Sequence, residues 1–180
     1  MRYVKWGFWL FVAALVGAVL HYTLPQRDIV RIVETEVERQ DFGVNSLFWA
    51  SADSGSAAAP VSRDVRFIRT VQDNGDVMVY RNEDTGWIWP PYFKFDSSDL
   101  QAEAANLIST KDTPQWLIVR HYGWRSNWLT IFPNAISVRP IEDPEIQLIP
   151  WFNIIFLVIL LALIRAVQVR VRRWWGRIAG

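Results

Sequence analysis

Two long runs without charge enclose a middle segment in which apolar and polar residues alternate. No Lys, Arg, Asp or Glu occurs between Lys5 and Arg27, and none occurs from 146 to 164. At the rise of an α-helix the second run is roughly 28 Å long, close to the hydrocarbon thickness of a bilayer. We therefore expect transmembrane helices over residues 6–24 and 150–167.

The first run has a second interpretation, as a secretory signal. Its basic start and apolar core are typical of such signals, and Val16-Gly17-Ala18 offers a cleavage site. We favour a retained helix because the apolar stretch is long for a signal and large residues surround the candidate cut. Tyr22 would then be an aromatic residue at the bilayer interface, and Pro25 would end the helix.

In the alternating middle segment, a period of two predicts strands and a period of 3.6 predicts one helix. A hairpin over 63–80 would turn at Asn74-Gly75, because that pair supplies the positive φ angles of tight turns. Further strands are expected over 28–39, 116–122, 128–132 and 135–141, an aromatic turn over 41–50 and a small polar loop over 51–62.

The expected helix covers residues 98–109, where Ala, Leu, Gln and Glu favour helix. Ser97 or Ser98 could cap it. Its apolar face, which would pack on the sheet, consists of Leu100, Ala104, Leu107 and Ile108. The predicted fold class is thus membrane-anchored α+β, with two transmembrane helices flanking a strand-dominated extracytoplasmic domain that contains one helix.

Charge sets the expected orientation of this protein in a membrane. Arg2 and Lys5 precede the first run, and Arg165 and four further arginines end or follow the second. Because Lys and Arg beside a span favour the cytoplasmic side, residues 1–5 and 168–180 are predicted to be cytoplasmic and 25–149 periplasmic. The basic tail could also bind lipid or dock a partner. Its candidate residues are Arg170, Arg172, Arg173, Trp174 and Trp175.

The middle segment is acidic, which narrows the choice of partner. It contains all 18 Asp and Glu but only 12 Lys and Arg, a net charge of −6. A nucleic-acid-binding domain needs a basic face, so we do not expect the middle segment to bind nucleic acid. The absence of cysteine excludes disulfides and thiolate chemistry.

The segment Trp87–Asp96 combines five aromatic residues with two prolines. One interpretation is a platform for a peptide, a sugar or a lipid headgroup, made by Trp87, Trp89, Tyr92 and Phe93 with Lys94 as its charge. The alternative, which we favour, is that these rings fill the core or lean on the membrane surface.

The sequence offers little support for a metal site, a haem site or a catalytic site. His21 and His121 could in principle hold a haem or a metal, but no carboxylate lies at metal-ligand spacing. Three acidic clusters, at 83–84, 96–99 and 142–145, have the character of solvated turns. No nucleophile elbow or phosphate-binding loop is present. We therefore expect no enzyme activity, no cofactor and no metal.

Three distinctive segments, at 21–32, 81–104 and 121–141, resemble a family of alphaproteobacterial membrane proteins catalogued only as a domain of unknown function. The resemblance extends from Met1 to about Trp175. It implies two membrane-spanning ends around an extracytoplasmic domain in a bacterial inner membrane, and it implies no catalytic residues.

The functional hypothesis is therefore a non-catalytic inner-membrane protein, both of whose termini are cytoplasmic. It would present its periplasmic domain as a scaffold or as an accessory subunit to a membrane or periplasmic protein partner. The alternative is a periplasmic ligand-binding module that uses the aromatic segment Trp87–Phe95.

Overall fold

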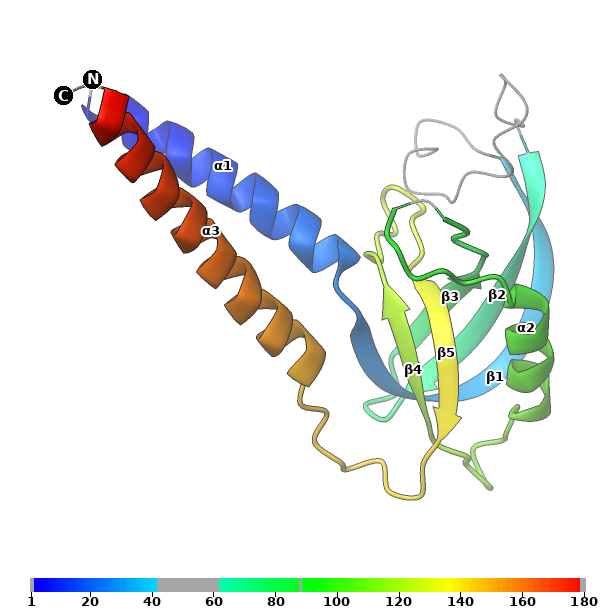
Figure 1. Ribbon diagram of the computed structural model, residues 1–180. Coiled ribbons are helices and arrows are strands. Elements are labelled where there is room, and N and C mark those ends of the chain that lie inside the picture. The colour runs from blue at the N-terminus through cyan, green and yellow to red at the C-terminus, as the bar shows by residue number, and fades with distance from the viewer. Residues whose placement is uncertain (1, 42–61, 88, 179–180) are drawn as a thin grey trace. The chain divides into compact units, whose positions relative to one another are not determined.

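The computed structural model describes residues 2–41, 62–87 and 89–178. The helices are α1 (Arg2–Thr23), α2 (Ser97–Asn106) and α3 (Trp151–Ile178). The strands are β1 (Gln26–Asp41), β2 (Ser62–Gln72), β3 (Val77–Asn82), β4 (Leu117–Tyr122) and β5 (Asn134–Pro140) (Figure 1). The chain divides into two units, residues 1–146 and 147–180, which are described separately.

The five strands form a closed barrel in the order β1-β2-β3-β5-β4. All neighbouring strands are antiparallel except β3 and β5, which run parallel. β1 closes the barrel because its first residues pair with β4 and the rest pair with β2, with a register shift between Ile32 and Glu34. This strand order, with a helix between β3 and β4, is that of the OB-fold.

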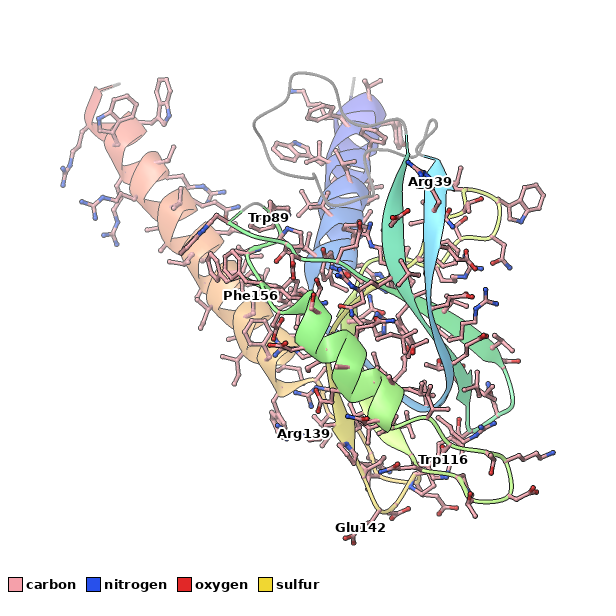
Figure 2. The ribbon with its side chains drawn as sticks, turned by 90° about the vertical axis from the view of Figure 1, so that its right-hand side faces the viewer. Arg39, Trp89, Trp116, Arg139, Glu142 and Phe156 are labelled. Carbon is pink, nitrogen blue, oxygen red and sulfur yellow. The ribbon has the colours of Figure 1, made fainter. Side chains whose placement is uncertain are left out.

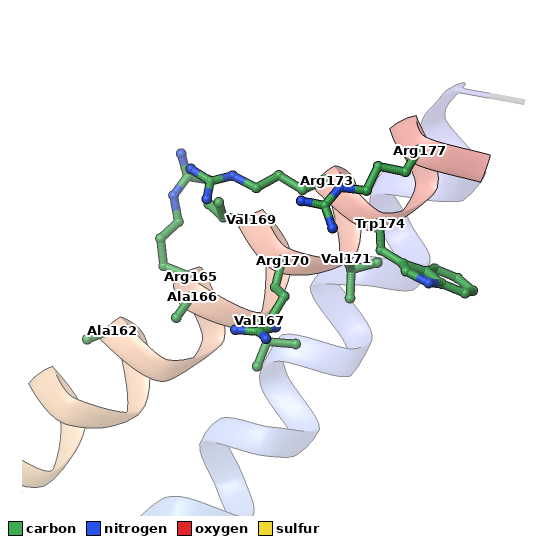
Figure 3. A pocket seen from close by; sticks show the side chains of 10 residues that line it. All are labelled: Ala162, Arg165, Ala166, Val167, Val169, Arg170, Val171, Arg173, Trp174 and Arg177. Carbon is green, nitrogen blue, oxygen red and sulfur yellow. The ribbon is translucent and has the colours of Figure 1, made fainter. Parts of the chain in front are cut away.

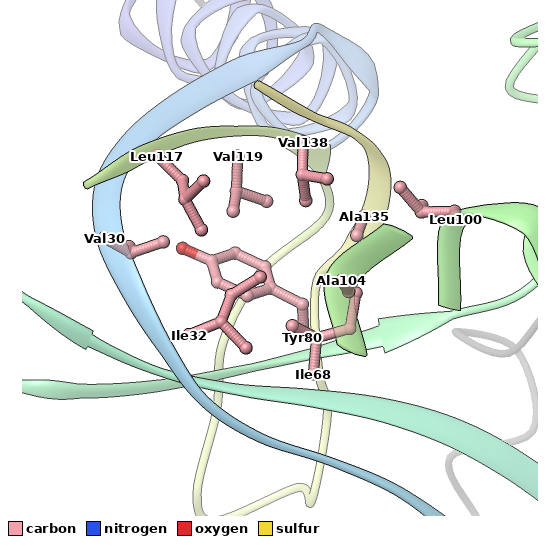
Figure 4. Close-up of a cluster of buried hydrophobic side chains, with 10 residues drawn as sticks. All are labelled: Val30, Ile32, Ile68, Tyr80, Leu100, Ala104, Leu117, Val119, Ala135 and Val138. Atoms are coloured by element: carbon pink, nitrogen blue, oxygen red, sulfur yellow. The ribbon is translucent and has the colours of Figure 1, made fainter. Parts of the chain in front are cut away.

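Inward-facing residues of every strand meet in one core, which α2 completes. Tyr80 lies in the middle of this cluster, and Leu100 and Ala104 reach it from α2 (Figure 4). The other members are the strand residues Val30, Ile32, Ile68, Leu117, Val119, Ala135 and Val138. The expected packing of one helix on the sheet is therefore confirmed, while closure of the sheet into a barrel was not foreseen.

The two ends of the barrel are defined by different strand pairings. At the end where α1 enters, Gln26 pairs with His121, and Asn134 pairs with Tyr122 and Arg81. We call this the anchor end. The opposite, distal end contains the β2–β3 turn and the pairing of Leu117 with Pro140.

Most of the predicted strands are confirmed, with one exception and one change of detail. The hairpin turn lies where expected, but only Gly75 has a positive φ, so Asn74 does not share that role. The strand expected over 128–132 is wrong, because this stretch is a turn followed by an isolated bridge between Ser126 and Ile131. The turn and loop expected over 42–61 lie outside the described residues.

α2 is shorter than expected and is capped differently. It ends at Asn106, so Ile108 lies beyond the helix and is exposed. The residue at its N-cap is Asp96, whose side chain makes no capping bond. Instead Asp84 accepts hydrogen bonds from both the backbone N–H and the hydroxyl of Ser97, at 2.9 and 3.0 Å. A carboxylate from another segment has thus replaced the expected serine cap.

α1 and α3 are both long and apolar enough to cross a membrane. α1 has 22 residues, which span about 33 Å, and α3 has 28 residues, which span about 42 Å. α3 continues without a break from its apolar half into the arginine-rich end.

Candidate functional site at the junction of α1 and the barrel

The C-terminal end of α1 is bonded directly to the barrel. The backbone N–H of Gly123 donates to the carbonyl of Tyr22 at 2.9 Å, and the hydroxyl of Tyr92 donates to the carbonyl of Thr23 at 2.5 Å. The indole N–H of Trp124 donates to Nδ1 of His21 at 2.9 Å. The first two bonds satisfy carbonyls at a helix end, which otherwise lack partners within the helix, and the third joins two side chains.

Aromatic rings surround these hydrogen bonds. The ring of Tyr22 meets Tyr122 and Trp124 edge-on, with centroids 6.2 and 5.3 Å apart. Tyr92 stacks on Tyr122 at 4.9 Å. Glycine at position 123 supplies the backbone conformation of this contact, because its φ of +96° is one that residues with a side chain rarely adopt. The helix end is therefore held by packing as well as by polar contacts.

A buried arginine lies behind the tyrosines. Arg81 is 2% exposed, and its Nη1 lies 3.0 Å from a carboxylate oxygen of Glu83. Burial lowers the pKa of Arg81 below its ordinary value, while hydrogen bonds to Tyr22 and Tyr122 act in the opposite direction. Glu83, expected in a solvated turn, is thus a buried partner of this cation, because a buried charge must be paired.

Asn134 ties the segment after β3 to β4. Its side-chain amide donates to the carbonyl of Glu83 at 3.0 Å and lies 3.1 Å from the hydroxyl of Tyr122, and its oxygen accepts from the Glu83 backbone N–H at 2.9 Å. The side chain is fully buried. It gives backbone groups that follow the end of β3 the partners that burial requires.

Lys94 is also buried, so it does not supply the charge of an exposed aromatic platform, which was one of the two interpretations of this segment. Its ammonium donates to Oδ1 of Asn82 at 2.5 Å and to the carbonyl of Ala135 at 2.7 Å. Burial lowers the pKa of Lys94 to about 7, although the nearby carboxylates of Asp84 and Asp96 oppose that shift. Lys94 therefore links the β3–α2 connection to the ends of β3 and β5.

A second polar group lies inside the barrel at the same end. The hydroxyl of Tyr80 donates to Oδ2 of Asp28 at 2.6 Å, and Nε2 of His121 lies 3.0 Å from the same oxygen. Burial opposes ionisation of Asp28, but His121 and Tyr80 outweigh it and leave the pKa of Asp28 below its ordinary value. His121 thus belongs to the barrel interior, whereas His21 contacts Trp124, so the two histidines have different partners.

The remaining aromatics of the predicted platform face outward. Trp87 is 81% exposed, and Trp89 and Phe93 are also exposed. The ring of Trp87 contacts Phe93 and Phe95, each at 5.5 Å between centroids. Of the five residues predicted as a platform, Tyr92 and Lys94 instead turn toward α1 and the barrel, and the exposed rings do not fill the core.

The basic residues of α3 gather along one side of its C-terminal half. Figure 3 shows a surface groove lined by Arg170, Arg173 and Trp174, together with further residues of the same helix. Arg172 and Trp175 of the predicted docking set do not line it. The other lining residues are Ala162, Arg165, Ala166, Val167, Val169, Val171 and Arg177.

Sequence reasoning missed most of the buried polar residues. Arg81, Asn82, Glu83 and Asn134 were assigned to turns or left without a role, yet all four are buried. Their partners lie up to 59 positions away along the chain, the separation of Arg81 from Tyr22, so no local spacing indicates them. The only available signal was that all four fall within the distinctive segments at 81–104 and 121–141.

This protein thus consists of a five-stranded barrel domain and two helices of membrane-spanning length. The chain belongs to the protein family of unknown function DUF1523, which it matches over residues 1–175. It is 35% identical over 162 residues to an uncharacterized protein of Haemophilus influenzae, a match that covers 87% of this chain and 88% of the relative. No solved structure matches the chain. The family is established, but its restriction to alphaproteobacteria is not.

Proposed function

We propose that this protein is a non-catalytic inner-membrane protein that holds its barrel in a fixed orientation on the periplasmic side, as a scaffold or accessory subunit. The observation that carries the proposal is the bonded junction between α1 and the barrel. A flexible tether would suffice to keep a domain near a membrane. Here Tyr22, Thr23 and His21 each make a contact with the barrel side, which supports a role that depends on orientation.

The chemistry of the buried groups supports a structural role. Lys94 donates to two protein oxygens, and Arg81 is paired with Glu83. Asp28 is held by Tyr80 and His121. A catalytic group needs access to a substrate, whereas these charged groups are used in joining strands and connections to one another.

The outer surface of the barrel supports the expectation that nucleic acid is not the partner. OB-folds commonly bind oligonucleotides across β2 and β3. In this chain the β4–β5 connection covers part of that face, because Phe132 packs on Phe67 at 5.0 Å and the Arg125 guanidinium lies 4.3 Å from the Phe132 ring centre. Beside it, Glu36 and two further glutamates of β1 surround Arg69.

The orientation can be tested with two reporters fused in turn after Gly180. Green fluorescent protein fluoresces only in the cytoplasm and alkaline phosphatase is active only in the periplasm. We expect fluorescence and no phosphatase activity at the C-terminus, and the reverse for insertion into the exposed β2–β3 turn after Asn74. Phosphatase activity after Gly180 would refute the topology.

The scaffold role can be tested by cross-linking in intact membranes. A photoreactive residue is placed at exposed positions of the outer barrel face, such as Val37, and the protein is then purified in mild detergent. We expect one dominant protein adduct in stoichiometric yield. A matched position inside α1, such as Leu10, should give lipid or no adduct. Recovery of only uncross-linked monomer from every barrel position would contradict the accessory-subunit role.

A second candidate is the ligand-binding module, favoured by one observation. A shallow pocket of about 350 Å³ opens beside the exposed aromatics and is lined by Tyr92, Phe93, Lys94, Phe95, Asp96 and Ile136. A periplasmic small molecule bound there would change tryptophan fluorescence in the wild type. The change should disappear in Trp87→Phe, because Trp87 contacts two lining residues, and persist in Trp128→Phe. No change with any compound class would remove this candidate.

A further inference from the structure

Large exposed aromatic side chains collect on the two connections at the anchor end. Trp87, Trp89, Phe93 and Phe95 belong to the β3–α2 connection, and Trp128, which is 98% exposed, belongs to the β4–β5 connection. We call these five residues the anchor-end aromatics. Clustered exposed apolar surface marks a place where a protein meets a membrane or another protein.

Both connections are bonded to the last turn of α1. Tyr92 lies in the first and donates to the carbonyl of Thr23. Trp124 lies in the second and donates to His21. Each set of exposed aromatics is therefore only a few residues from a direct contact with the end of the helix.

The position of that helix end sets the level of a bilayer. α1 has 22 residues, so at about 33 Å it is as long as the hydrocarbon core is thick. Its last turn must then lie at the outer headgroups, and residues bonded to this turn lie at the same level. Tryptophan and tyrosine are enriched at that level of a membrane, because their rings are apolar and their polar atoms reach water.

Among the described residues, the distal end of the barrel has no comparable group of large exposed aromatics. Its exposed ionisable residues are six acidic and two basic side chains, namely Asp73, Asp76, Lys111, Asp112, Arg139, Glu142, Asp143 and Glu145. Figure 2 shows Trp89 toward one end of the barrel, with Trp116 and Glu142 toward the other. Charge alone does not distinguish the two ends, because Asp84, Asp96 and Asp99 are exposed near the anchor end as well. The inferred orientation therefore depends on the exposed aromatics and on the end of α1.

We infer that the anchor-end aromatics insert into the interfacial layer of the bilayer, so that the barrel lies on the membrane surface with its distal end outward. The inference rests on the proposed membrane span α1. The backbone conformation at Phe93 helps to form this aromatic surface. Phe93 has a φ of +51°, a conformation that is rare for residues other than glycine, and its ring packs against the ring of Trp87.

The test uses the full chain, which has no native cysteine. Single-cysteine variants Trp87→Cys and Trp128→Cys are made, together with Val77→Cys at the distal end and Leu10→Cys within α1. All four native side chains are exposed. Each variant carries a nitroxide label and is reconstituted, without other proteins, into vesicles of phosphatidylethanolamine and phosphatidylglycerol. Collision rates with oxygen, which partitions into lipid, and with a water-soluble nickel chelate are then measured.

We expect the ratio of oxygen to nickel collision rates to be at least threefold higher at 87 and 128 than at 77, and highest at 10. If positions 87 and 128 both match position 77 while position 10 is in lipid, the barrel is anchored but its aromatics face water or an absent protein partner. That result overturns the inference alone. If position 10 is also in water, the membrane anchoring fails. Because positions 87 and 128 lie on different connections, loss of folding in one variant leaves the other informative.

Discussion

At the scale of single residues, Lys94 shows how a charge can be kept in an almost closed site. The side chain is 4% exposed, and its ammonium has two oxygen acceptors. Removing the amine would leave Oδ1 of Asn82 and the carbonyl of Ala135 buried without that donor. If the amine stays protonated, a charge is buried, which costs free energy. The pKa of Lys94 is lowered because this cost of burial opposes the protonated form.

This conflict predicts a dependence of stability on pH. The pKa of Lys94 is about 7 in the folded protein, below the ordinary value for lysine, so between these values the unfolded chain binds more protons. The free energy of unfolding should therefore rise as pH increases from 7 to 9.5, by at most about 3 kcal/mol, and this contribution should become flat below about pH 6.

The measurement is thermal unfolding of the detergent-solubilised protein across that pH range. Lys94→Met serves as the control, because it keeps a long apolar side chain and cannot be protonated. The variant should be less stable than the wild type at pH 9.5 and should lack the rise. Parallel curves for the two proteins would show that Lys94 does not titrate in this range.

Residue-level sequence reasoning succeeded where the environment is local. Glu142, Asp143 and Glu145 lie in an exposed turn as expected, with the Glu145 N–H bonded to the Asp143 side chain. It failed for Glu83, which also lies in a polar stretch but is buried against Arg81. What separates these cases is tertiary contact, because β4 and α1 bring Tyr122 and Tyr22 against Arg81 from far along the chain.

At the scale of elements, alternation of apolar and polar residues was a good guide to β1, β2, β3, β4 and β5. It was misleading over 128–132, where Trp128 and Leu129 are exposed and Thr130 has a φ of +49°. Among the described residues, this stretch makes only the isolated bridge between Ser126 and Ile131, so its alternating residues do not lie on the face of a sheet. Barrel closure was also beyond the sequence, because it depends on one strand pairing with two others, with a register shift at Ile32 and Glu34.

The junction between α1 and the barrel gives a prediction at this scale. Gly123 and Gly75 both have φ near +90°, which is strained for alanine, and an added Cβ would meet nothing within 4 Å at Gly75 and only ordinary van der Waals contacts, at 3.4 Å or more, at Gly123. Each alanine variant should therefore cost about 1–2 kcal/mol of backbone strain. In Gly123→Ala this strain falls on the residue whose N–H donates to the carbonyl of Tyr22, so it should loosen the helix end.

Hydrogen–deuterium exchange distinguishes a local effect from general destabilisation. In Gly123→Ala, the amides of residues 19–27 should exchange at least tenfold faster than in the wild type, while those of the β2–β3 hairpin change little. In Gly75→Ala the pattern should be reversed. Equal exchange near α1 in both variants would mean that Gly123 does not hold the helix to the barrel.

At the scale of the whole molecule, the prediction of two membrane-spanning helices depended mainly on the two uncharged runs and the flanking arginines. They gave helices of spanning length at both ends of the chain, because bilayer thickness is a constraint that sequence length can meet directly. Nothing in the sequence indicated that the helix end and the barrel would form one bonded unit. That property arises from hydrogen bonds made by Tyr92, Gly123 and Trp124, together with the packing of the Tyr22 ring on Tyr122 and Trp124.

If both helices span the membrane, the connector between β5 and α3 must return along the barrel. β5 runs from the anchor end to the distal end, and its seven residues cover about 23 Å. The ten residues from Ile141 to Pro150 reach at most about 35 Å when extended. The connector is therefore long enough to bring Trp151 back to the bilayer, with little length to spare.

Deletion of residues 142–145 should break this arrangement. The six remaining connector residues reach at most about 21 Å, less than the length of β5, so a folded barrel and an inserted α3 become incompatible. With green fluorescent protein after Gly180, we expect the deletion to lose most of its folded, membrane-inserted protein, measured as fluorescence in the membrane fraction and as a lowered melting temperature. Replacing the same four residues by Gly-Ser-Gly-Ser removes three acidic side chains but keeps the length, so it should behave as the wild type. If the deletion matched this replacement in both measurements, the connector would not need to cover the length of β5, and the distal end of the barrel would not face away from the bilayer.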